Sequence, residues 1–507
     1  MIHTNTHRIK TVWRFTVCLV CLLILINTVI SSQDAASPID ELKSVLTELE
    51  DYQQGGNDDV VLLLTELLRR YRFTPEYRDA CEAELIAFLN SDATPAAKME
   101  VCRQLRIFGS AASVPVLSKM LADENTADLA RYALEKIPGE EADSALIDSL
   151  ATSHKKIQLG IISSLGKRGT EAAVPYLERV LFGSDKDLAA TTAEALAYIG
   201  NPGAMRVLSE ALDKTKERLQ IRIAESLLFC AERALSSDSK ESAALIYGKV
   251  FNNSDLSDEI RGSALTGKIR SAGVSGRSII WNILQGKEKT LFLYAIQMIL
   301  ECYDENSIQP LCSLLPRLSQ PFNVHMINIL AAFRSPAVLD AVTSSLKSED
   351  RAVRLASLQA LEKVGNSSTV GIVSEFAAQA RGEEREAART CLWNLSGKGI
   401  DRAVLDEVNQ NPSPEIQAEL VLCVGERRIY KGRSYLMALA ASPDAENRLL
   451  AVKTLKDVSQ PEDLPQLLDI LLAADDDRFC DEMILTATMT ARKIRQISRQ
   501  ADVFVSR

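Results

Sequence analysis

The chain has 507 residues, and its 68 acidic residues against 58 basic ones give it a net charge of −10. This acidic balance opposes a role on nucleic acid or on an anionic membrane surface, since both are polyanions that attract basic proteins. Only His154 and His325 follow the first 32 residues, which leaves no His-based metal cluster or catalytic pair in the sequence.

The first 32 residues have the layout of a secretory signal peptide. Three basic residues precede an uncharged apolar run at residues 15–30, and two serines follow at a cleavage site. Cleavage would remove three basic residues and no acidic ones, which would change the net charge to −13. The alternative is an uncleaved membrane anchor, because nineteen residues separate Arg14 from Asp34 and a membrane-spanning helix needs about 20. We therefore expect export to the periplasm or cell envelope, with membrane attachment only if the segment is retained.

Residues 33–95 look helical but do not follow the spacing of the residues after them. Ser37-Pro38 opens one expected helix, Gly55-Gly56 breaks it, and Thr74-Pro75 begins another. Terminal units of repeat proteins are atypical, because one of their faces meets solvent. The segment is therefore predicted to be a helical N-terminal cap.

An apolar anchor residue recurs at near-constant spacing through residues 96–478. Successive anchors are 29 to 34 residues apart, except for one step of 42, and a period in this range indicates stacked structural repeats. A helix pair of this size cannot bury its own apolar face, so neighbouring pairs supply the missing core. The twelve anchors are Leu105, Leu134, Leu165, Leu196, Leu227, Ile269, Leu300, Leu330, Leu361, Leu392, Val421 and Leu455.

The clearest repeat runs over residues 173–200 and contains two short amphipathic helices. In the first helix, Leu177 and Leu181 follow the spacing of one helix face. In the second helix, an apolar stripe includes Leu196 and ends before Gly200, which is expected to cap the helix.

Two repeats carry an Asp in the turn between their helices and an Arg at the start of the second helix. These residues are Asp350 and Arg354 in SEDRAVRLASLQALEKVG, and Asp444 and Arg448 in SPDAENRLLAVKTL. In this pattern the sequence resembles the HEAT-repeat family and its short bacterial form, the phycocyanobilin-lyase-type HEAT-like repeat. The resemblance covers about residues 96–490, although most repeats lack the Asp/Arg pair and the period is shorter than the roughly 40 to 47 residues of HEAT and armadillo units. It implies an all-α solenoid, a right-handed superhelix of stacked HEAT-like helix pairs.

The 42-residue step holds the one large insertion, near residues 236–258. Insertions in solenoids map to loops, so we expect a surface loop there. Residues 479–507 are expected to form a C-terminal capping helix and tail. Basic residues predict that this helix is solvated: Arg492, Lys493, Arg495 and Arg499.

Eight cysteines follow the N-terminal segment, each alone in the sequence. Cys102, Cys230 and Cys391 fall on the core side of predicted helices, so packing is a better interpretation than a disulfide framework. Cys302 and Cys312 are the pair to test if an oxidised form exists. The sequence contains no zinc-protease HExxH, no phosphate-binding loop and no Gly-x-Ser-x-Gly motif. We therefore predict no catalytic residue, no metal site and no cofactor.

Two positions of each second helix lie roughly opposite the core stripe, two residues before and two after the anchor. In a HEAT-like solenoid they face the concave side. In the N-terminal half these positions hold a line of large apolar side chains, which suits a peptide-binding groove. The alternative is that neighbouring helices or the insertion cover them. The predicted protein-binding residues are Ile107, Tyr132, Glu194, Tyr198, Glu225, Phe229 and Met298.

From the sequence alone, we predict a non-enzymatic scaffold of the bacterial cell envelope that binds a protein or peptide on its concave face. The alternative is a bilin-lyase-like enzyme or chromophore-handling protein, because the bilin lyases share this repeat type. A HEAT-like nucleic-acid enzyme would conflict with the acidic balance and with the export segment.

Overall fold

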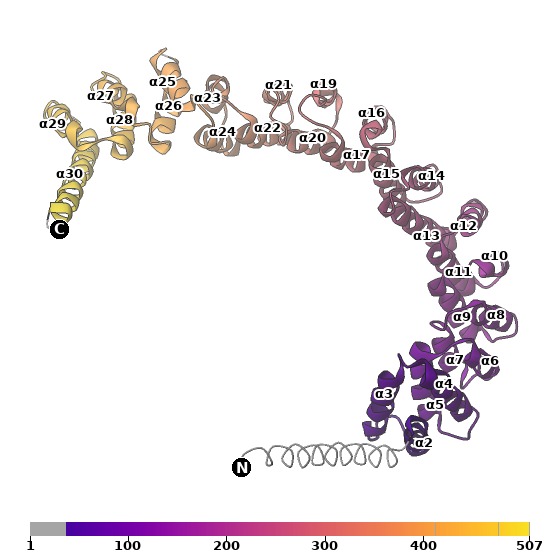
Figure 1. Cartoon of the computed structure of the whole chain (residues 1–507). Helices are drawn as coiled ribbons and strands as arrows, with labels where there is room; N and C mark the ends of the chain where they lie inside the picture. Colours follow the sequence, from indigo (N-terminus) through magenta and orange to yellow (C-terminus); the bar gives the residue numbers. More distant parts are fainter. Residues whose placement is uncertain (1–36, 411, 475, 506–507) are drawn as a thin grey trace, which may run out of the picture. The chain divides into compact units, whose positions relative to one another are not determined.

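The computed structural model describes residues 37–410, 412–474 and 476–505. Residues 1–32, predicted to be a signal peptide or membrane anchor, lie outside this part of the chain. The described residues form α-helices and short 3-10 helices without a β-strand (Figure 1). Among these residues, no helix has both the length and the apolar character needed to span a bilayer. The predicted all-α solenoid of stacked helix pairs is confirmed.

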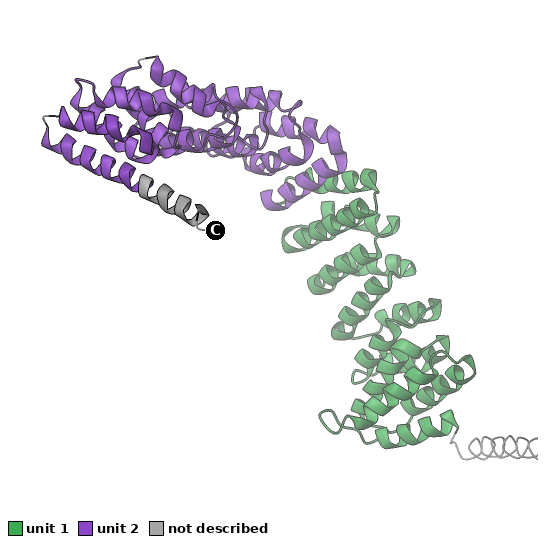
Figure 2. Ribbon diagram, turned by 60° about the vertical axis from the view of Figure 1, so that its left-hand side comes forward, with its two compact units in different colours: residues 1–256 green, residues 257–507 purple. Residues whose placement is uncertain are grey.

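The chain divides into two compact units, unit 1 up to Leu256 and unit 2 from Ser257 (Figure 2). Unit 1 begins with α2 (Pro38–Leu49) and α3 (Asp59–Tyr71), both within the predicted N-terminal cap. First helices of its pairs are α4 (Pro75–Leu89), α6 (Val114–Leu121), α8 (Glu140–Leu150), α10 (Val174–Leu181), α12 (Pro202–Lys214) and α14 (Lys240–Phe251). Second helices are α5 (Pro95–Phe108), α7 (Ala127–Leu134), α9 (Lys155–Arg168), α11 (Lys186–Ile199) and α13 (Glu217–Ser236).

Unit 2 begins with α15 (Asp258–Ala272), and its last helix, α30 (Asp477–Val505), packs on the two helices before it. First helices are α16 (Gly276–Gln285), α19 (Gln309–Leu314), α21 (Pro336–Ser345), α23 (Thr369–Gln379), α25 (Ile400–Asn409), α27 (Arg433–Ala440) and α29 (Leu464–Leu472). Second helices are the broken pair α17 (Phe292–Gln297) and α18 (Ile299–Cys302), then α20 (Phe322–Leu330), α22 (Arg351–Val364), α24 (Glu383–Asn394), α26 (Pro414–Glu426) and α28 (Ala445–Val458).

Eleven of the twelve predicted anchors are buried, and Leu300 is the exception, with 51% of its surface exposed. Its neighbours Met298 and Ile299 are buried instead. The second helix is interrupted here, since α17 ends at Gln297 and α18 begins at Ile299. The break turns the core face by one residue. The prediction of Leu300 as an anchor is therefore wrong, and so is the prediction that Met298 is exposed.

The anchor predicted in α26 lies one turn too early. In α11, α22 and α28 the anchor comes eleven residues after the N-cap, and in α26 this position is Val424. Val421 is buried as well, but counting from it places Glu419 and Cys423 opposite the core, whereas both are buried. Residues 420–425 of α26 are all apolar or Gly, so the sequence does not show which of them is the anchor.

The predicted insertion near residues 236–258 has a different conformation from the expected loop. Residues 240–251 form α14, and α13 continues to Ser236, so that it has 20 residues where α9 and α11 have 14. The segment 217–236 contains neither Gly nor Pro, so nothing in its sequence interrupts the helix after one repeat length. The extra residues lengthen a helix instead of forming a loop.

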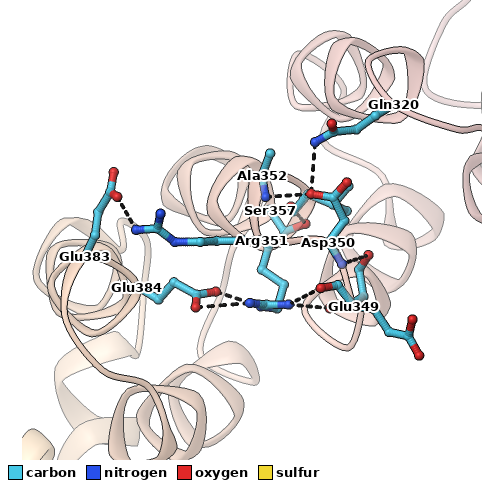
Figure 3. Close-up of polar contacts among 11 residues, drawn as sticks. Gln320, Glu349, Asp350, Arg351, Ala352, Ser357, Glu383 and Glu384 are labelled. Atoms are coloured by element: carbon cyan, nitrogen blue, oxygen red, sulfur yellow. Dashed lines mark hydrogen bonds and ion pairs between the residues drawn. The ribbon is translucent and has the colours of Figure 1, made fainter.

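Of the two Asp/Arg pairs of the HEAT-like pattern, Asp350 and Arg354 bond to the repeats on either side, through Gln320 and Glu384 (Figure 3). Asp350 caps α22 by accepting a hydrogen bond from the backbone of Ala352 at 2.8 Å. The Arg354 guanidinium donates to both carboxylate oxygens of Glu384 on α24, at 2.6 and 3.1 Å, and to the carbonyl oxygen of Ser348 at 2.8 Å. This two-point contact holds the pKa of the Glu384 carboxyl below its usual value.

Arginines from one repeat also cap the second helix of the repeat before it. Arg168 donates to the carbonyl oxygens of Leu134 at 2.6 Å and Ile137 at 2.5 Å, at the end of α7, and pairs with Asp143 at 2.6 Å. Arg427 makes similar bonds at the end of α24. The last carbonyls of a helix lack helical partners, and a positive charge is favoured beside them.

Candidate protein-binding surface

Helices α11 and α13 bring four of the predicted binding residues together. Glu194 and Tyr198 lie one turn apart on α11, and Glu225 and Phe229 lie one turn apart on α13. The two helices pack against each other. The ring centroids of Tyr198 and Phe229 are 5.4 Å apart with their planes inclined at 60°, a tilted arrangement that aromatic rings favour.

These side chains surround a hollow of about 180 Å³, here called the Tyr198–Phe229 hollow. Tyr198 is 51% exposed and Phe229 is 43% exposed, so both rings remain accessible despite their contact. The Arg222 guanidinium pairs with Glu225 at 2.8 Å and also with Glu194. Two carboxylates share one guanidinium, which leaves the lining with one excess negative charge. The hollow is lined by Glu194, Ala197, Tyr198, Arg222, Glu225, Ser226 and Phe229.

Arg233 fixes α13 to the end of α11. Its guanidinium donates to the carbonyl oxygens of Ala197 at 2.9 Å and Tyr198 at 2.8 Å. It also lies 5.8 Å from the centre of the Phe229 ring, within the range of a cation–π contact. The helix ends next to these carbonyls at Gly200, which has a left-handed φ of +63°. These bonds fix the end of α11 against α13, the two helices that carry the aromatic rings.

A second hollow, of about 840 Å³, adjoins the first, since Phe229 lines both. It lies beside the lengthened end of α13, which supplies Glu232, Arg233 and Ser236 to its lining. Glu232 accepts a hydrogen bond from the Tyr247 hydroxyl of α14. Together the two hollows span helices α11 to α14 of unit 1.

Ile107 and Tyr132 are exposed, by 61% and 37%, but neither lines the Tyr198–Phe229 hollow. Arg106 covers one side of Tyr132, with its guanidinium 4.2 Å from the ring centre and donating to the hydroxyl at 2.6 Å. On α9, between the two patches, the corresponding exposed position holds Lys167. The predicted apolar line is therefore two separate patches, and the buried Met298 belongs to neither.

Sequence reasoning missed Arg222 and Arg233. Arg222 has a sequence signal, because it lies three residues before Glu225 and such pairs face each other on a helix. Arg233 has none, because its partners are backbone carbonyls of the preceding repeat, 35 and 36 residues away.

Within the described residues the eight cysteines are all free thiols, and all except Cys480 are buried. Burial raises the pKa of Cys102 and Cys423 to about 12 and that of Cys230 and Cys312 to about 11, because a thiolate loses its hydration in an apolar interior. The same residues contain no group of three or more His, Cys, Asp or Glu side chains that could hold a metal ion.

Cys480 is expected to react with iodoacetamide before any of the other seven described cysteines in the native protein. The thiolate is the reactive form, so buried thiols with raised pKa values react slowly. Peptide mapping by mass spectrometry measures the labelling of each site, and labelling in denaturant controls for intrinsic reactivity. Equally fast native labelling of Cys302 or Cys312 would contradict the burial of these thiols.

The profile of HEAT repeats matches residues 144–228, 308–393 and 402–483, together about half of the chain. No curated protein matches the sequence. Among solved structures, the chain is similar to Kap121p bound to Pho4p, with 13% identity and a TM-score of 0.42 over 93% of this chain and 56% of that chain. It is also similar to importin beta in an ammonium sulfate condition, with 11% identity and a TM-score of 0.38 over 96% of this chain and 78% of that chain. The chain thus spans just over half the length of Kap121p.

Proposed function

Because this chain belongs to the HEAT-repeat family, we propose that it is a non-enzymatic scaffold that binds a protein or peptide segment at the Tyr198–Phe229 hollow. One observation carries the proposal. Two adjacent second helices place an exposed aromatic pair beside a hollow, and Arg233 of α13 bonds to the backbone carbonyl of Tyr198 on α11. Aromatic side chains in such preformed surfaces dominate the affinity of many protein interfaces.

The dimensions of the hollow favour a protein partner. Its volume of about 180 Å³ is below the range of about 300 to 1,000 Å³ that is usual for small-molecule pockets. There is room for one large apolar side chain between Tyr198 and Phe229. The residues that follow this anchor in the partner would cross the adjoining hollow beside the end of α13.

Charge favours a partner segment with basic residues beside its apolar anchor. Residues 37–256 hold 35 acidic residues against 25 basic ones, whereas residues 257–507 are nearly balanced. The hollow itself has one excess carboxylate. Complementary charge mainly accelerates association and selects between partners. Raising the salt concentration should therefore slow capture of the partner.

We further propose that the scaffold works outside the cytoplasm, at the bacterial cell envelope. The support is the sequence of residues 1–32, with basic residues before an apolar run and small residues after it. Fractionation of cells that produce the full chain tests this part of the proposal. Recovery in the cytoplasmic fraction would contradict it.

The binding proposal predicts that Tyr198→Ala and Phe229→Ala each weaken the partner's affinity by at least about 1 to 2 kcal/mol, or roughly 5- to 30-fold in Kd. The full chain is used to capture partners from an envelope extract, the captured protein is identified by mass spectrometry, and its Kd is measured with each variant. Both rings are partly exposed, so helicity measured by circular dichroism should not change.

Tyr176→Ala is the matched control, because Tyr176 is a 46% exposed aromatic residue of α10 that does not line the hollow. It should leave the affinity unchanged. Full binding by the Tyr198→Ala/Phe229→Ala double variant, with its helicity intact, would place the interface elsewhere on the chain.

A further inference from the structure

The last helix pair leaves an apolar face uncovered. Five large apolar side chains of α29 and α30 are between 38% and 85% exposed. We call these residues the C-terminal end face: Leu468, Leu472, Ile484, Leu485 and Met489. Figure 1 shows the pair at the end of the helix series. Terminal repeats normally have a polar outer face, because that face meets water.

In α30 one of these exposed positions, Ile484, corresponds to a position that contacts the next repeat in the rest of the stack. Leu485 and Met489 correspond instead to Glu194 and Tyr198 of α11, which face away from the core. Asp476 accepts a hydrogen bond from the backbone of Phe479 at 2.7 Å at the start of the helix, and Ile484 lies eight residues after Asp476. The same position after the N-cap Asp is Ala193 in α11, Leu358 in α22 and Val452 in α28, and all three are fully buried. Ile484 is 52% exposed. It therefore occupies an inter-repeat core position that no described residue covers.

The two exposed leucines of α29 also correspond to positions that contact the next repeat. Counted from the first residue of each helix, they correspond to Glu178 and Phe182 of α10. Glu178 pairs with Arg206 of the next first helix at 3.1 Å, and Lys214 of that helix lies 5.1 Å from the centre of the Phe182 ring. Both positions thus face the next repeat. At Leu468, Leu472 and Ile484 the end face therefore resembles an internal contact between repeats.

The charges beside this face are self-complementary. Asp481, Leu485, Thr488 and Arg492 are all exposed and follow the i, i+4, i+7, i+11 spacing of one face of α30. In an antiparallel pair of such helices, Asp481 of each chain lies opposite Arg492 of the other chain, which gives two opposite-charge pairs. Leu485 of each chain lies opposite Thr488 of the other. A parallel pair would place like charges opposite each other. Neither Asp481 nor Arg492 has an ion-pair partner among the side chains that the structure describes.

We propose that a second copy of this chain covers the C-terminal end face, with the two α30 helices packed antiparallel about a two-fold axis. A self-complementary face is what a two-fold symmetric interface needs, because each patch meets its own copy. The contact would bury the apolar side chains of both chains, as a further repeat does inside the stack. This face belongs to unit 2, so its role is independent of the Tyr198–Phe229 hollow of unit 1.

Sedimentation velocity of the full chain over a range of concentrations tests the proposal. The wild-type chain should be dimeric, and Leu485→Lys should raise the dimer Kd at least tenfold. Leu245→Lys is the matched control, since Leu245 is a 77% exposed leucine of α14, and it should leave the dimer unchanged. Circular dichroism checks that each variant is folded. A monomeric wild-type chain, or a dimer insensitive to Leu485→Lys, would overturn the proposal.

Charge reversal tests the antiparallel arrangement without altering an apolar residue. Asp481→Arg and Arg492→Asp should each weaken the dimer several-fold, because each places like charges opposite each other at both ends of the contact. The double variant Asp481→Arg/Arg492→Asp restores opposite charges and should recover the wild-type Kd. Weakening by both single changes without recovery in the double variant would overturn the arrangement, as would capture of a different protein that displaces the second copy from this face.

Discussion

Leu196→Ala is expected to lower the free energy of unfolding by about 2 to 5 kcal/mol. Leu196 is fully buried on α11, which packs on both α9 and α13. Truncation removes buried apolar surface and leaves a cavity that the neighbouring helices fill only in part. Chemical denaturation followed by circular dichroism measures the change.

Leu300→Ala provides the matched control for Leu196→Ala. Leu300 occupies the same place in the sequence pattern, but it is 51% exposed, so its truncation should cost no more than about 0.5 kcal/mol. The damage from Leu196→Ala should also be local, because stability in repeat arrays depends mainly on nearest neighbours. Hydrogen exchange should accelerate first in α9, α11 and α13. Uniform acceleration along the whole chain would contradict the repeat architecture.

Arg168→Met is expected to destabilise unit 1 by about 3 kcal/mol or more. The side chain of Arg168 is only 8% exposed, and it binds Asp143 and the carbonyl oxygens of Leu134 and Ile137. Removing one partner of a buried pair leaves the other charge and the helix carbonyls without compensation. Thermal and chemical denaturation of the variant measure the loss.

Arg402→Met is the control for this substitution. Arg402 is 86% exposed and pairs with Asp406 at 3.6 Å along one helix, and exposed pairs of this kind contribute at most about 1 kcal/mol. Equal destabilisation by both variants would mean that the helix-capping bonds of Arg168 do not matter for stability.

The repeat period could be predicted from the sequence because each helix pair buries one apolar face against its neighbours in the same way. A regular helix places one apolar stripe toward its neighbours, so the anchors recur wherever the helix is unbroken. Leu300 fails this rule because α17 and α18 are separated at Met298. The local sequence, FLYAIQMILEC, contains neither Gly nor Pro. The residue types that usually indicate a helix break are therefore absent from it.

The candidate site could be predicted in part. The exposure of Tyr198 and Phe229 follows from their places opposite the core stripe, and so does their proximity on neighbouring second helices. The bonds of Arg233 to backbone carbonyls and the hollow beside the longer α13 could not be predicted, because they depend on how two repeats meet. Whether these residues bind a partner remains a prediction.

The uncovered end face could not be predicted from the sequence either. The basic residues after Ala491 predict a solvated cap, although exposed apolar residues lie one to two turns earlier in the same helix. Ile484 looks like an ordinary core residue in the sequence, and it is exposed because no described repeat packs beside it. Leu485 is exposed because it occupies the position of Glu194 in α11, which faces away from the core.

Hydrogen–deuterium exchange of the full chain with and without the captured partner tests the binding claim most directly. Exchange should slow in α11 and α13 around Tyr198 and Phe229, where the partner's anchor would enter the hollow and restrict local opening. The Tyr198→Ala/Phe229→Ala variant should lose this protection at the same partner concentration. Protection confined to unit 2, or to first helices that do not line the two hollows, would contradict the claim that this surface binds the partner.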